Sequence, residues 1–534
     1  MPRLLDSRVG FALVAGLYLL SFPYHPGLRS PNELCRLWQA RALVDFHTLS
    51  INGTLQQLGM VGDLSCTATV ERDGVRTLHP CVGPLAPREG VVAMHYYPSK
   101  APLLSLLGAP VYWVLSRLEA PVSELWQVAV SRLVLTVLPA LGLLWLLRRF
   151  LLASLAPEVA DLVTIAYGLG TMAFSYAEAF MSHQLTAVLL FAAFSCAWQV
   201  ERGAWRERGY LLAGALAGAV VAAEYTGALG VLCVAAYAVA ARWGRWGALA
   251  RAAGLVVVGS APLLGGLLWY HQAAYGSPFV SGYAFLNDAT YQGWHQGGFL
   301  GIRVPDARAL GLSLFSPLRG LFALSPFLLA VPFGLKALKA RDRALFAFTV
   351  VLLLANTYFT ASFSYDSWGW TVGPRHLTPM VPFLMLPVGL ALAGLLAAKG
   401  SLGRSVLLGL LASSVLATGL VGFVNYVPDD VSTSLWGLAI PLLRAGYWPV
   451  SWLAAWVPNP ASGAFLVLLL VALVAWLLAR AVRVGGAVPA VLAAVLFVHF
   501  AALLLATRDD AHDEAARAFL KKVWVAPDGQ RLGF

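Results

Sequence analysis

The chain has 534 residues, of which 59% are hydrophobic and only 12% are charged, and its mean hydropathy is +0.72. Soluble domains are much less apolar, so this composition excludes an ordinary soluble protein. A net charge of +11 could indicate nucleic-acid binding, but the Arg and Lys residues fall in short clusters between apolar runs rather than along one basic face. The basic residues therefore carry information about membrane topology.

The apolar runs predict an all-α, polytopic membrane protein with about 13 transmembrane helices, since runs of about 18 to 25 residues are long enough to cross a bilayer. Backbone groups in lipid must be satisfied within the segment, and such long runs favour helices over barrel strands. The first run lacks a small-residue cleavage site and is expected to be an uncleaved anchor. The expected spans are residues 9–25, 125–147, 158–176, 183–200, 209–223, 227–241, 252–270, 318–335, 344–362, 377–397, 405–424, 462–479 and 486–506.

The basic clusters predict a cytoplasmic N-terminus and a periplasmic C-terminus. This topology requires that the apolar stretch 101–119 lies on the outer surface as an interfacial helix, as its shortness, Pro102, Pro110 and Trp113 indicate. Short loops without a signal peptide suggest a bacterial inner membrane. The clusters then placed inside are Arg3 and Arg8, Arg148 and Arg149, residues 202–208, Arg242, Arg245 and Arg251, residues 336–343, Lys399 and Arg404, and Arg480 and Arg483.

We expect residues 1–534 to form one transmembrane domain with three notable periplasmic segments. These are a first loop with interfacial helices at 26–124, a second long loop at 271–317, and a short tail at 507–534 that carries a surface helix. The two loops exceed ordinary loop length, which favours a functional role. Cys66 and Cys81 share the first loop, where they either form a disulfide in an oxidising compartment or stay as free thiols.

The sequence lacks the signatures of soluble enzymes. It contains no GxxxxGK[ST] phosphate loop, no glycine-rich dinucleotide fingerprint, no HExxH and no GxSxG. Chemistry driven by ATP is therefore not expected on this chain. The energy must come from an activated substrate, a gradient or a partner.

The first periplasmic loop concentrates residues that suit chemistry at the membrane surface. Glu33 and Arg36 begin an amphipathic helix directly after the first span, and a carboxylate there can act as a general base toward a hydroxyl or an amine. Further on, the motif HYYPSKAP contains Tyr97 and Lys100. Lys100 is suited to hold a lipid-linked phosphate at headgroup depth.

Together these motifs resemble the GT-C superfamily of membrane glycosyltransferases. They are most similar to its protein-mannosyltransferase and aminoarabinose-transferase branch, which is glycosyltransferase family 39-like. The resemblance implies a fold of about 13 spans, a sugar donor linked to polyprenyl phosphate, and transfer of the sugar with inversion on the periplasmic side. It covers most of the chain as topology, and its specific motifs lie in residues 31–41, 95–102 and 175–184.

The resemblance carries over residue by residue with two departures. The family begins its first loop with Asp-Glu, whereas this chain has Asn32-Glu33, and Asn cannot serve as a base. Either Glu33 has taken the role, or another carboxylate such as Asp63 has, or the protein is not catalytic. Lys100-Ala101-Pro102 matches the family's Lys-Pro-Pro, while His183 stands where an acidic residue often opens the fourth span.

A second polar group lies in the loop YDSWGWTVGPRHLTP, outside the motifs of the resemblance. Arg375 suits a phosphate and Trp368 or Trp370 could stack on a sugar, but the tryptophans could equally be interface anchors and Asp366 a partner of Arg375. Glu224 lies between two short spans, where it is either functional or exposed to water in a turn.

The sequence thus predicts a lipid-phosphosugar-dependent hexosyl- or pentosyltransferase with Glu33 as its catalytic base. No cofactor or metal is expected, and the expected partners are a polyprenyl-phosphate-sugar donor, a lipid, glycan or protein acceptor, and membrane lipids, without nucleic acid. The alternatives are a transporter or flippase for a lipid-linked glycan, or a non-catalytic assembly protein with the same fold. The residues expected to bind substrate are Asn32, Arg36, Tyr97, Lys100, His183, Asp366, Arg375 and His376.

Overall fold

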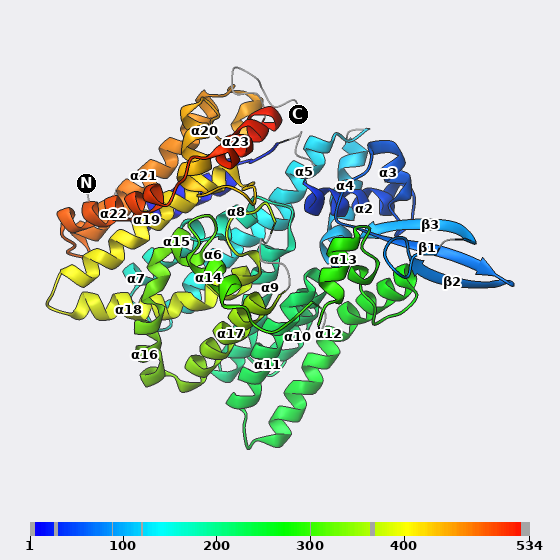
Figure 1. Ribbon diagram of the computed structural model, residues 1–534. Coiled ribbons are helices and arrows are strands. Elements are labelled where there is room, and N and C mark those ends of the chain that lie inside the picture. Colours follow the sequence, from blue (N-terminus) through cyan, green and yellow to red (C-terminus); the bar gives the residue numbers. More distant parts are fainter. Residues whose placement is uncertain are drawn as a thin grey trace.

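The computed structural model describes residues 6–25, 30–87, 89–118, 121–298, 301–363 and 369–524. Most of these residues lie in helices that pack into one bundle, and a small sheet projects from one side of it (Figure 1). Up to residue 201 the helices are α1 (Ser7–Leu20), α2 (Pro31–Asp45), α3 (Asn52–Leu58), α4 (Leu103–Leu118), α5 (Glu124–Arg132), the π-helical η2 (Leu133–Val137), α6 (Leu138–Leu151), α7 (Pro157–Gly170), α8 (Ala173–Ala177) and α9 (Ser182–Glu201).

The middle of the chain contributes the longest helix and the second long loop. α12 spans 30 residues and lies at the edge of the bundle, with most of its surface uncovered. The helices here are α10 (Gly209–Ala223), η3 (Tyr225–Gly227), α11 (Ala228–Ala241), α12 (Trp246–Tyr275), η4 (Gly282–Phe285), α13 (Ala289–Gln296), α14 (Ala307–Phe315), α15 (Leu321–Leu324), η5 (Pro326–Ala330), α16 (Val331–Arg341) and α17 (Arg343–Ser362).

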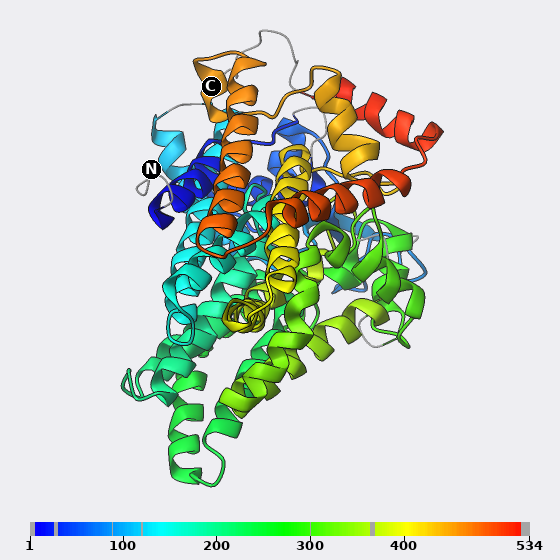
Figure 2. The ribbon, with the colours of Figure 1, turned by 90° about the vertical axis from the view of Figure 1, so that its left-hand side faces the viewer.

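The C-terminal third closes the bundle against the first helix. α21 packs along α1 although the two stand near opposite ends of the chain (Figure 2), and the ring of Trp476 lies against Gly10. The helices of this third are η6 (Arg375–Leu384), α18 (Met385–Ala397), α19 (Leu402–Val424), η7 (Leu435–Ala439), α20 (Ile440–Arg444), η8 (Trp452–Ala455), α21 (Ala461–Arg483), α22 (Pro489–Leu505) and α23 (Ala511–Val523).

The helices confirm a polytopic membrane protein. Within the described residues, 7 helices are long and apolar enough to cross a membrane. Shorter apolar helices include α1, α10, α11 and α22, and each of the predicted spans overlaps one or more helices. The long helices are Glu124–Leu151, Ser182–Glu201, Trp246–Tyr275, Arg343–Ser362, Arg375–Ala397, Leu402–Val424 and Ala461–Arg483.

Two predicted spans are wrong in detail because they are interrupted. The expected span 158–176 divides at Thr171 into α7 and α8, and the expected span 318–335 is shared by α15, η5 and α16. Ser325 adopts a non-helical backbone before Pro326, as expected for a residue that precedes proline. The first turns of the span 377–397 form a 3₁₀ helix that contains two prolines, which lack the amide N–H that an α-helix needs.

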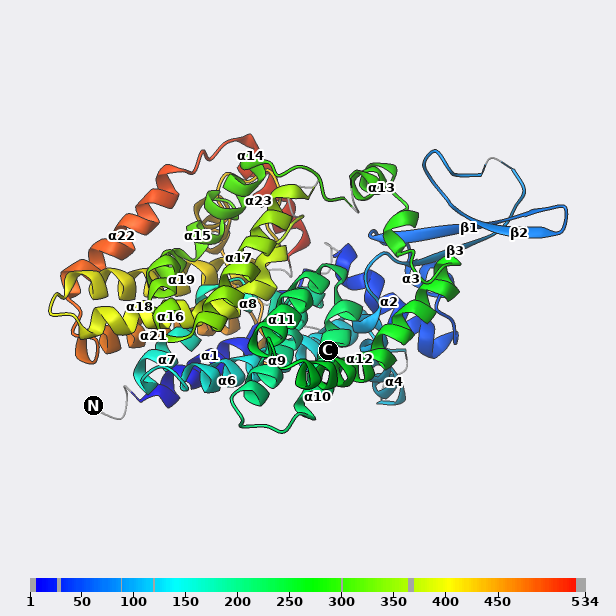
Figure 3. The same cartoon turned by 90° about the horizontal axis from the view of Figure 1, so that it is seen from below.

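A three-stranded antiparallel sheet occupies the first long loop, and the sequence analysis did not predict it. Its strands are β1 (Leu64–Arg72), β2 (Val75–Pro80) and β3 (Val91–Pro98), in the order β2-β1-β3. The turn Asp73-Gly74, with both residues at positive φ, joins β1 to β2, and Asp-Gly is a strong hairpin signal. Figure 3 shows the sheet extending away from the bundle. Of the two alternatives left open for Cys66 and Cys81, the structure shows the disulfide, which links β1 to the residue after β2.

Three helices form where the sequence predicts helices outside the membrane spans, but α2 is buried and does not have the amphipathic character that was predicted. Residues 103–118 form α4, which packs against α2, and residues 511–523 form α23 in the expected tail. α2 begins with Pro31 at its first turn, a position where the missing N–H of proline costs no hydrogen bond. Because α2 is buried along most of its length, its polar side chains face other parts of the protein rather than solvent.

Candidate functional site

Glu33 lies in the first turn of α2, and both of its carboxylate oxygens accept hydrogen bonds from other residues. Arg132 Nε and Nη2 donate to its two carboxylate oxygens at 2.9 and 2.7 Å, Tyr426 Oη donates to Oε2 at 2.5 Å, and the Phe180 amide donates to Oε1. Burial opposes ionisation of Glu33, but Arg132 and these hydrogen bonds together lower the pKa of the carboxyl. The carboxylate is thus a buried ion-pair partner of Arg132 rather than of Arg36, and this geometry argues against Glu33 as a general base.

Arg36, one turn further along α2, points to a different set of groups. Its Nη1 donates to the Asn32 carbonyl at 2.6 Å and to the Asn32 side chain, and its Nη2 donates to Ser182 Oγ at 3.1 Å. The residue is 1% exposed, and none of the described carboxylates forms an ion pair with it. Among the described residues, Arg36 is therefore a buried cation without a carboxylate partner.

Asp63 and Lys100 meet at the base of the sheet. Asp63 precedes β1 and Lys100 follows β3, and the antiparallel pairing of Leu64 with Pro98 brings the two ends together. Lys100 Nζ lies 3.3 Å from Asp63 Oδ1. Burial raises the pKa of Asp63, but the charges of Lys100 and Arg375 outweigh it and hold the pKa below its usual value. Burial lowers the pKa of Lys100, Asp63 raises it, and the net shift is upward.

Arg375 opens η6 and adds a third positive charge to the same place. Its charge lowers the pKa of both Asp63 and Lys100, so it lies near enough to act on both groups. Its Nε is buried without a hydrogen-bond partner, and it forms no ion pair with any carboxylate in the described part of the chain. Like Arg36, it has a buried Nε without a hydrogen-bond partner in the described part of the chain.

Aromatic rings from the second long loop cover Lys100. Lys100 Nζ lies 5.4 Å from the centre of the Tyr283 ring, within reach of a cation–π interaction, and Tyr283 stacks on His295 with ring centres 4.1 Å apart. Burial, Lys100 and Arg375 lower the pKa of His295 to about 4. The imidazole is therefore neutral at pH 7.

A second carboxylate approaches from the turn between α10 and α11. Glu224 Oε2 accepts a hydrogen bond from Ser182 Oγ at 2.6 Å and lies 3.8 Å from His183 Nδ1. The His183 ring is in edge contact with His376, with ring centres 5.7 Å apart. Both histidines therefore border the carboxylate and the cations.

We refer to these residues as the Lys100 cluster. It contains three cations and two carboxylates, which leaves one positive charge in excess when its histidines are neutral. Its members come from seven segments that are far apart in sequence, so only the folded chain assembles it. They are Arg36, Asp63, Lys100, His183, Glu224, Tyr283, His295, Arg375 and His376.

The structure brings most of the predicted substrate-binding residues together in this cluster. Asn32 borders it through Arg36. Tyr97 does not join it, because it packs with Tyr275 and other aromatic residues beside the sheet. Asp366 lies outside the described residues. The sequence analysis missed Tyr283 and His295, and only their place in an unusually long loop pointed to them.

The described residues contain no group of three His, Cys, Asp or Glu side chains arranged to hold a metal ion, and metal independence stays a prediction.

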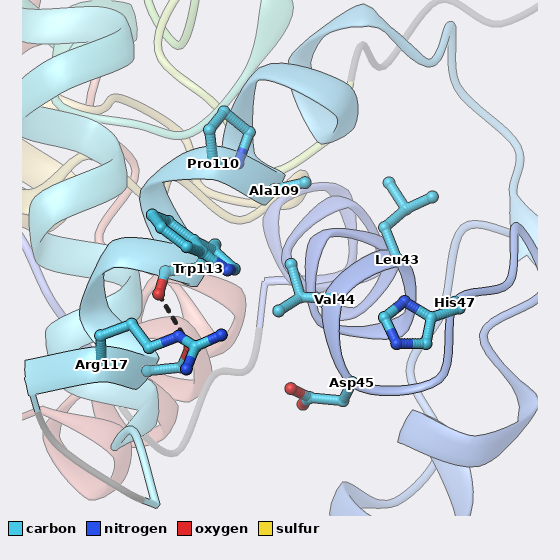
Figure 4. A pocket seen from close by; sticks show the side chains of 9 residues that line it. Leu43, Val44, Asp45, His47, Ala109, Pro110, Trp113 and Arg117 are labelled. Carbon is cyan, nitrogen blue, oxygen red and sulfur yellow. Dashed lines mark hydrogen bonds between the residues drawn. The ribbon is translucent and has the colours of Figure 1, made fainter.

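An open groove of about 570 Å³ lies away from the Lys100 cluster, between the end of α2 and α4. Figure 4 shows Asp45 and His47 on one side of it and Trp113 and Arg117 on the other. No member of the Lys100 cluster lines this groove.

No protein-family model matches the sequence, and no characterised protein matches it by sequence. Among solved structures, the chain is similar to apo ArnT from Cupriavidus metallidurans. The sequences are 15% identical, the match covers 96% of this chain and 76% of ArnT, and the TM-score is 0.47. For ArnT bound to undecaprenyl phosphate, the identity is 13%, the coverages are 89% and 75%, and the TM-score is 0.43.

The chain is also similar to the arabinosyltransferase EmbB from Mycobacterium smegmatis, solved by cryo-electron microscopy. The identity is 14%, the TM-score is 0.44, and the match covers 94% of this chain but only 40% of EmbB. With similarities this low, the function must be inferred from the chain's own side chains.

Proposed function

We propose that the protein is a GT-C-type glycosyltransferase of the bacterial inner membrane. It takes a sugar from a polyprenyl-phosphate-linked donor and transfers it to a lipid, glycan or protein acceptor on the periplasmic face. The observation that carries this proposal is the excess positive charge of the Lys100 cluster, where the buried Arg36 and the partly buried Arg375 lack carboxylate partners among the described residues. Buried cations are costly unless they are paired, so a bound anion is the natural complement.

A lipid-linked sugar phosphate fits this charge. The donor is a phosphodiester with one negative charge, and the departing polyprenyl phosphate is a monoester with a charge of about −1.5 to −2 at neutral pH. Cations therefore bind the leaving phosphate more strongly than the donor. An interaction that strengthens as the bond breaks lowers the barrier, and this is how the cluster accelerates transfer without a nucleotide.

The roles follow from the geometry. Lys100 and Arg375 hold the donor phosphate, and Arg36 contributes positive charge from the α2 side. When the phosphate binds, it competes with Asp63 for Lys100; in the structure these two side chains form an ion pair of 3.3 Å. His183 and His376 border the same space and position one of the substrates.

The two alternative functions fit the site less well. A transporter is expected to place its charged residues in the middle of the membrane, but Asp63, Lys100 and His295 belong to loop segments. A non-catalytic assembly protein would have no use for unpaired buried cations, which destabilise the fold unless they bind something. Both observations favour the enzyme.

The test is sugar transfer in proteoliposomes from a panel of polyprenyl-phosphate-linked hexoses and pentoses. We expect the wild type to turn over at least one of these donors. We expect Lys100→Gln to bind undecaprenyl phosphate about ten- to a hundredfold more weakly, which is the usual effect of losing a charge-assisted hydrogen bond. Arg117→Gln, which removes an exposed cation from α4, serves as the matched control. A wild type that binds none of these lipids, or a Lys100→Gln variant that binds them normally, contradicts the proposal.

A further inference from the structure

Glu224 has fewer hydrogen-bond and ion-pair partners than Glu33, and unlike Asp63 it is not paired with a lysine. Glu33 accepts four hydrogen bonds, and Asp63 forms an ion pair with Lys100. Glu224 is 6% exposed, its Oε2 accepts from Ser182, and no described residue donates to its Oε1. It therefore has one carboxylate oxygen available inside a buried site.

The location of Glu224 suits a role beside the donor phosphate. Burial raises the pKa of the Tyr283 hydroxyl, Lys100 opposes this, and the charges of Glu224, Arg375 and Asp63 act on the same hydroxyl. Tyr283 is also the ring that covers Lys100. Glu224 consequently lies on the border of the site that we assign to the phosphate.

Ser182 connects the carboxylate to the cations. Its hydroxyl accepts a hydrogen bond from Arg36 Nη2 at 3.1 Å and donates one to Glu224 Oε2 at 2.6 Å. When a cation such as Arg36 donates a hydrogen bond to the hydroxyl oxygen, the hydroxyl becomes a better donor itself, because hydrogen bonds in a chain polarise one another. Ser182 thus holds Glu224 in place through Oε2 and leaves Oε1 without a donor among the described residues.

We propose that Glu224 is the general base of the transfer reaction and that Ser182 is its positioning residue, an inference that rests on the proposed function. An oxygen or nitrogen of the acceptor attacks the anomeric carbon of the sugar, and the bond between that carbon and the phosphate oxygen breaks. Its electron pair leaves with the polyprenyl phosphate. The proton of the acceptor hydroxyl or amine passes to Glu224 Oε1, which becomes a neutral carboxyl.

The experiment compares Glu224→Gln with the wild type in the proteoliposome assay. Gln keeps the shape and can still accept the hydrogen bond from Ser182, but it cannot take a proton. We expect turnover to fall by about 10² to 10⁴-fold, the usual contribution of a general base, while undecaprenyl phosphate binding is retained. Glu158→Gln makes the same chemical change at an exposed position of α7 and is the matched control.

Ser182→Ala gives a second readout that does not depend on Glu224→Gln folding correctly. Without the hydrogen bond from Ser182 the Glu224 carboxylate is no longer held in one orientation, so kcat should fall while KM for the donor stays close to that of the wild type. Normal turnover by Glu224→Gln together with an unchanged kcat in Ser182→Ala would overturn this inference and leave the proposed function standing. A wild type without turnover on any donor would overturn the proposed function itself.

Discussion

Glu33 and Glu224 are both buried glutamates, yet their surroundings give them different properties. Glu33 is clamped between Arg132 and Tyr426, and its charge neutralises an arginine that is also buried. Glu224 has a single hydroxyl donor and an available oxygen. At the scale of single residues, the number of donors around a carboxylate decides between a structural and a chemical role.

Replacement of Glu33 by Gln should therefore destabilise the protein. Removal of one partner from a buried ion pair leaves an uncompensated charge on Arg132 and costs about 3 to 5 kcal/mol. Denaturant unfolding in detergent, with Glu158→Gln as the exposed control, measures this cost. If Glu33→Gln instead unfolds like the wild type, binds undecaprenyl phosphate and loses turnover, then Glu33 is the base that the sequence motif suggested.

At the scale of elements, close contact between helices positions the loop that covers the site. α10 and α12 cross where Gly214 faces the backbone of Val256 and Gly259 faces the backbone of Leu211. A Cβ atom at either glycine would overlap a carbonyl oxygen of the opposite helix. Small residues at such crossings allow membrane helices to approach closely, and α12 leads directly into the loop that carries Tyr283.

Gly259→Leu should force α10 and α12 apart and destabilise the protein by about 1 to 3 kcal/mol, as overpacking usually does. Gly265→Leu makes the same change on α12 at a position where an added Cβ meets no atom within 4 Å, so its stability should stay close to that of the wild type. Thermal unfolding of the two variants in detergent tests the contact. Equal stability of the two variants would show that the crossing does not depend on glycine.

At the scale of the whole molecule, the basic loops and the Lys100 cluster belong to different ends of the bundle. In Figure 1 the sheet projects to the right, whereas the turn between α18 and α19 lies at the left and the turn between α11 and α12 at the bottom. Both turns carry the Arg or Lys residues that the positive-inside rule assigns to the cytoplasm. The sheet and the cluster at its base therefore belong to the periplasmic side in the proposed topology.

Cysteine labelling in intact cells tests this topology. Val75→Cys places a thiol on the exposed hairpin, and Trp205→Cys places one in the basic loop between α9 and α10, where the native side chains are 62% and 46% exposed. We expect a membrane-impermeant maleimide to label residue 75 directly and residue 205 only after permeabilisation. The reverse pattern would place the site in the cytoplasm and contradict the predicted orientation.

The sequence by itself determined the class of protein, the position of nearly all apolar helices and several members of the site. Apolar runs and basic clusters are local features, and burial in lipid translates them directly into spans and sides. Lys100 was found in the motif that precedes the expected interfacial helix, and His183 and Arg375 were found because each is a polar residue at the edge of a predicted span. The Asp73-Gly74 turn was also readable, and it would have indicated the hairpin.

Only the tertiary structure decided which carboxylates face the cations. Glu33 stands next to the expected motif, but its side chain is taken by Arg132 and Tyr426, which follow it by 99 and 393 residues. Asp63 reaches Lys100 through strand register, and Glu224 reaches Arg36 through Ser182. Side-chain partners across such distances depend on how helices pack and rotate against one another, and no local pattern in the sequence records that rotation.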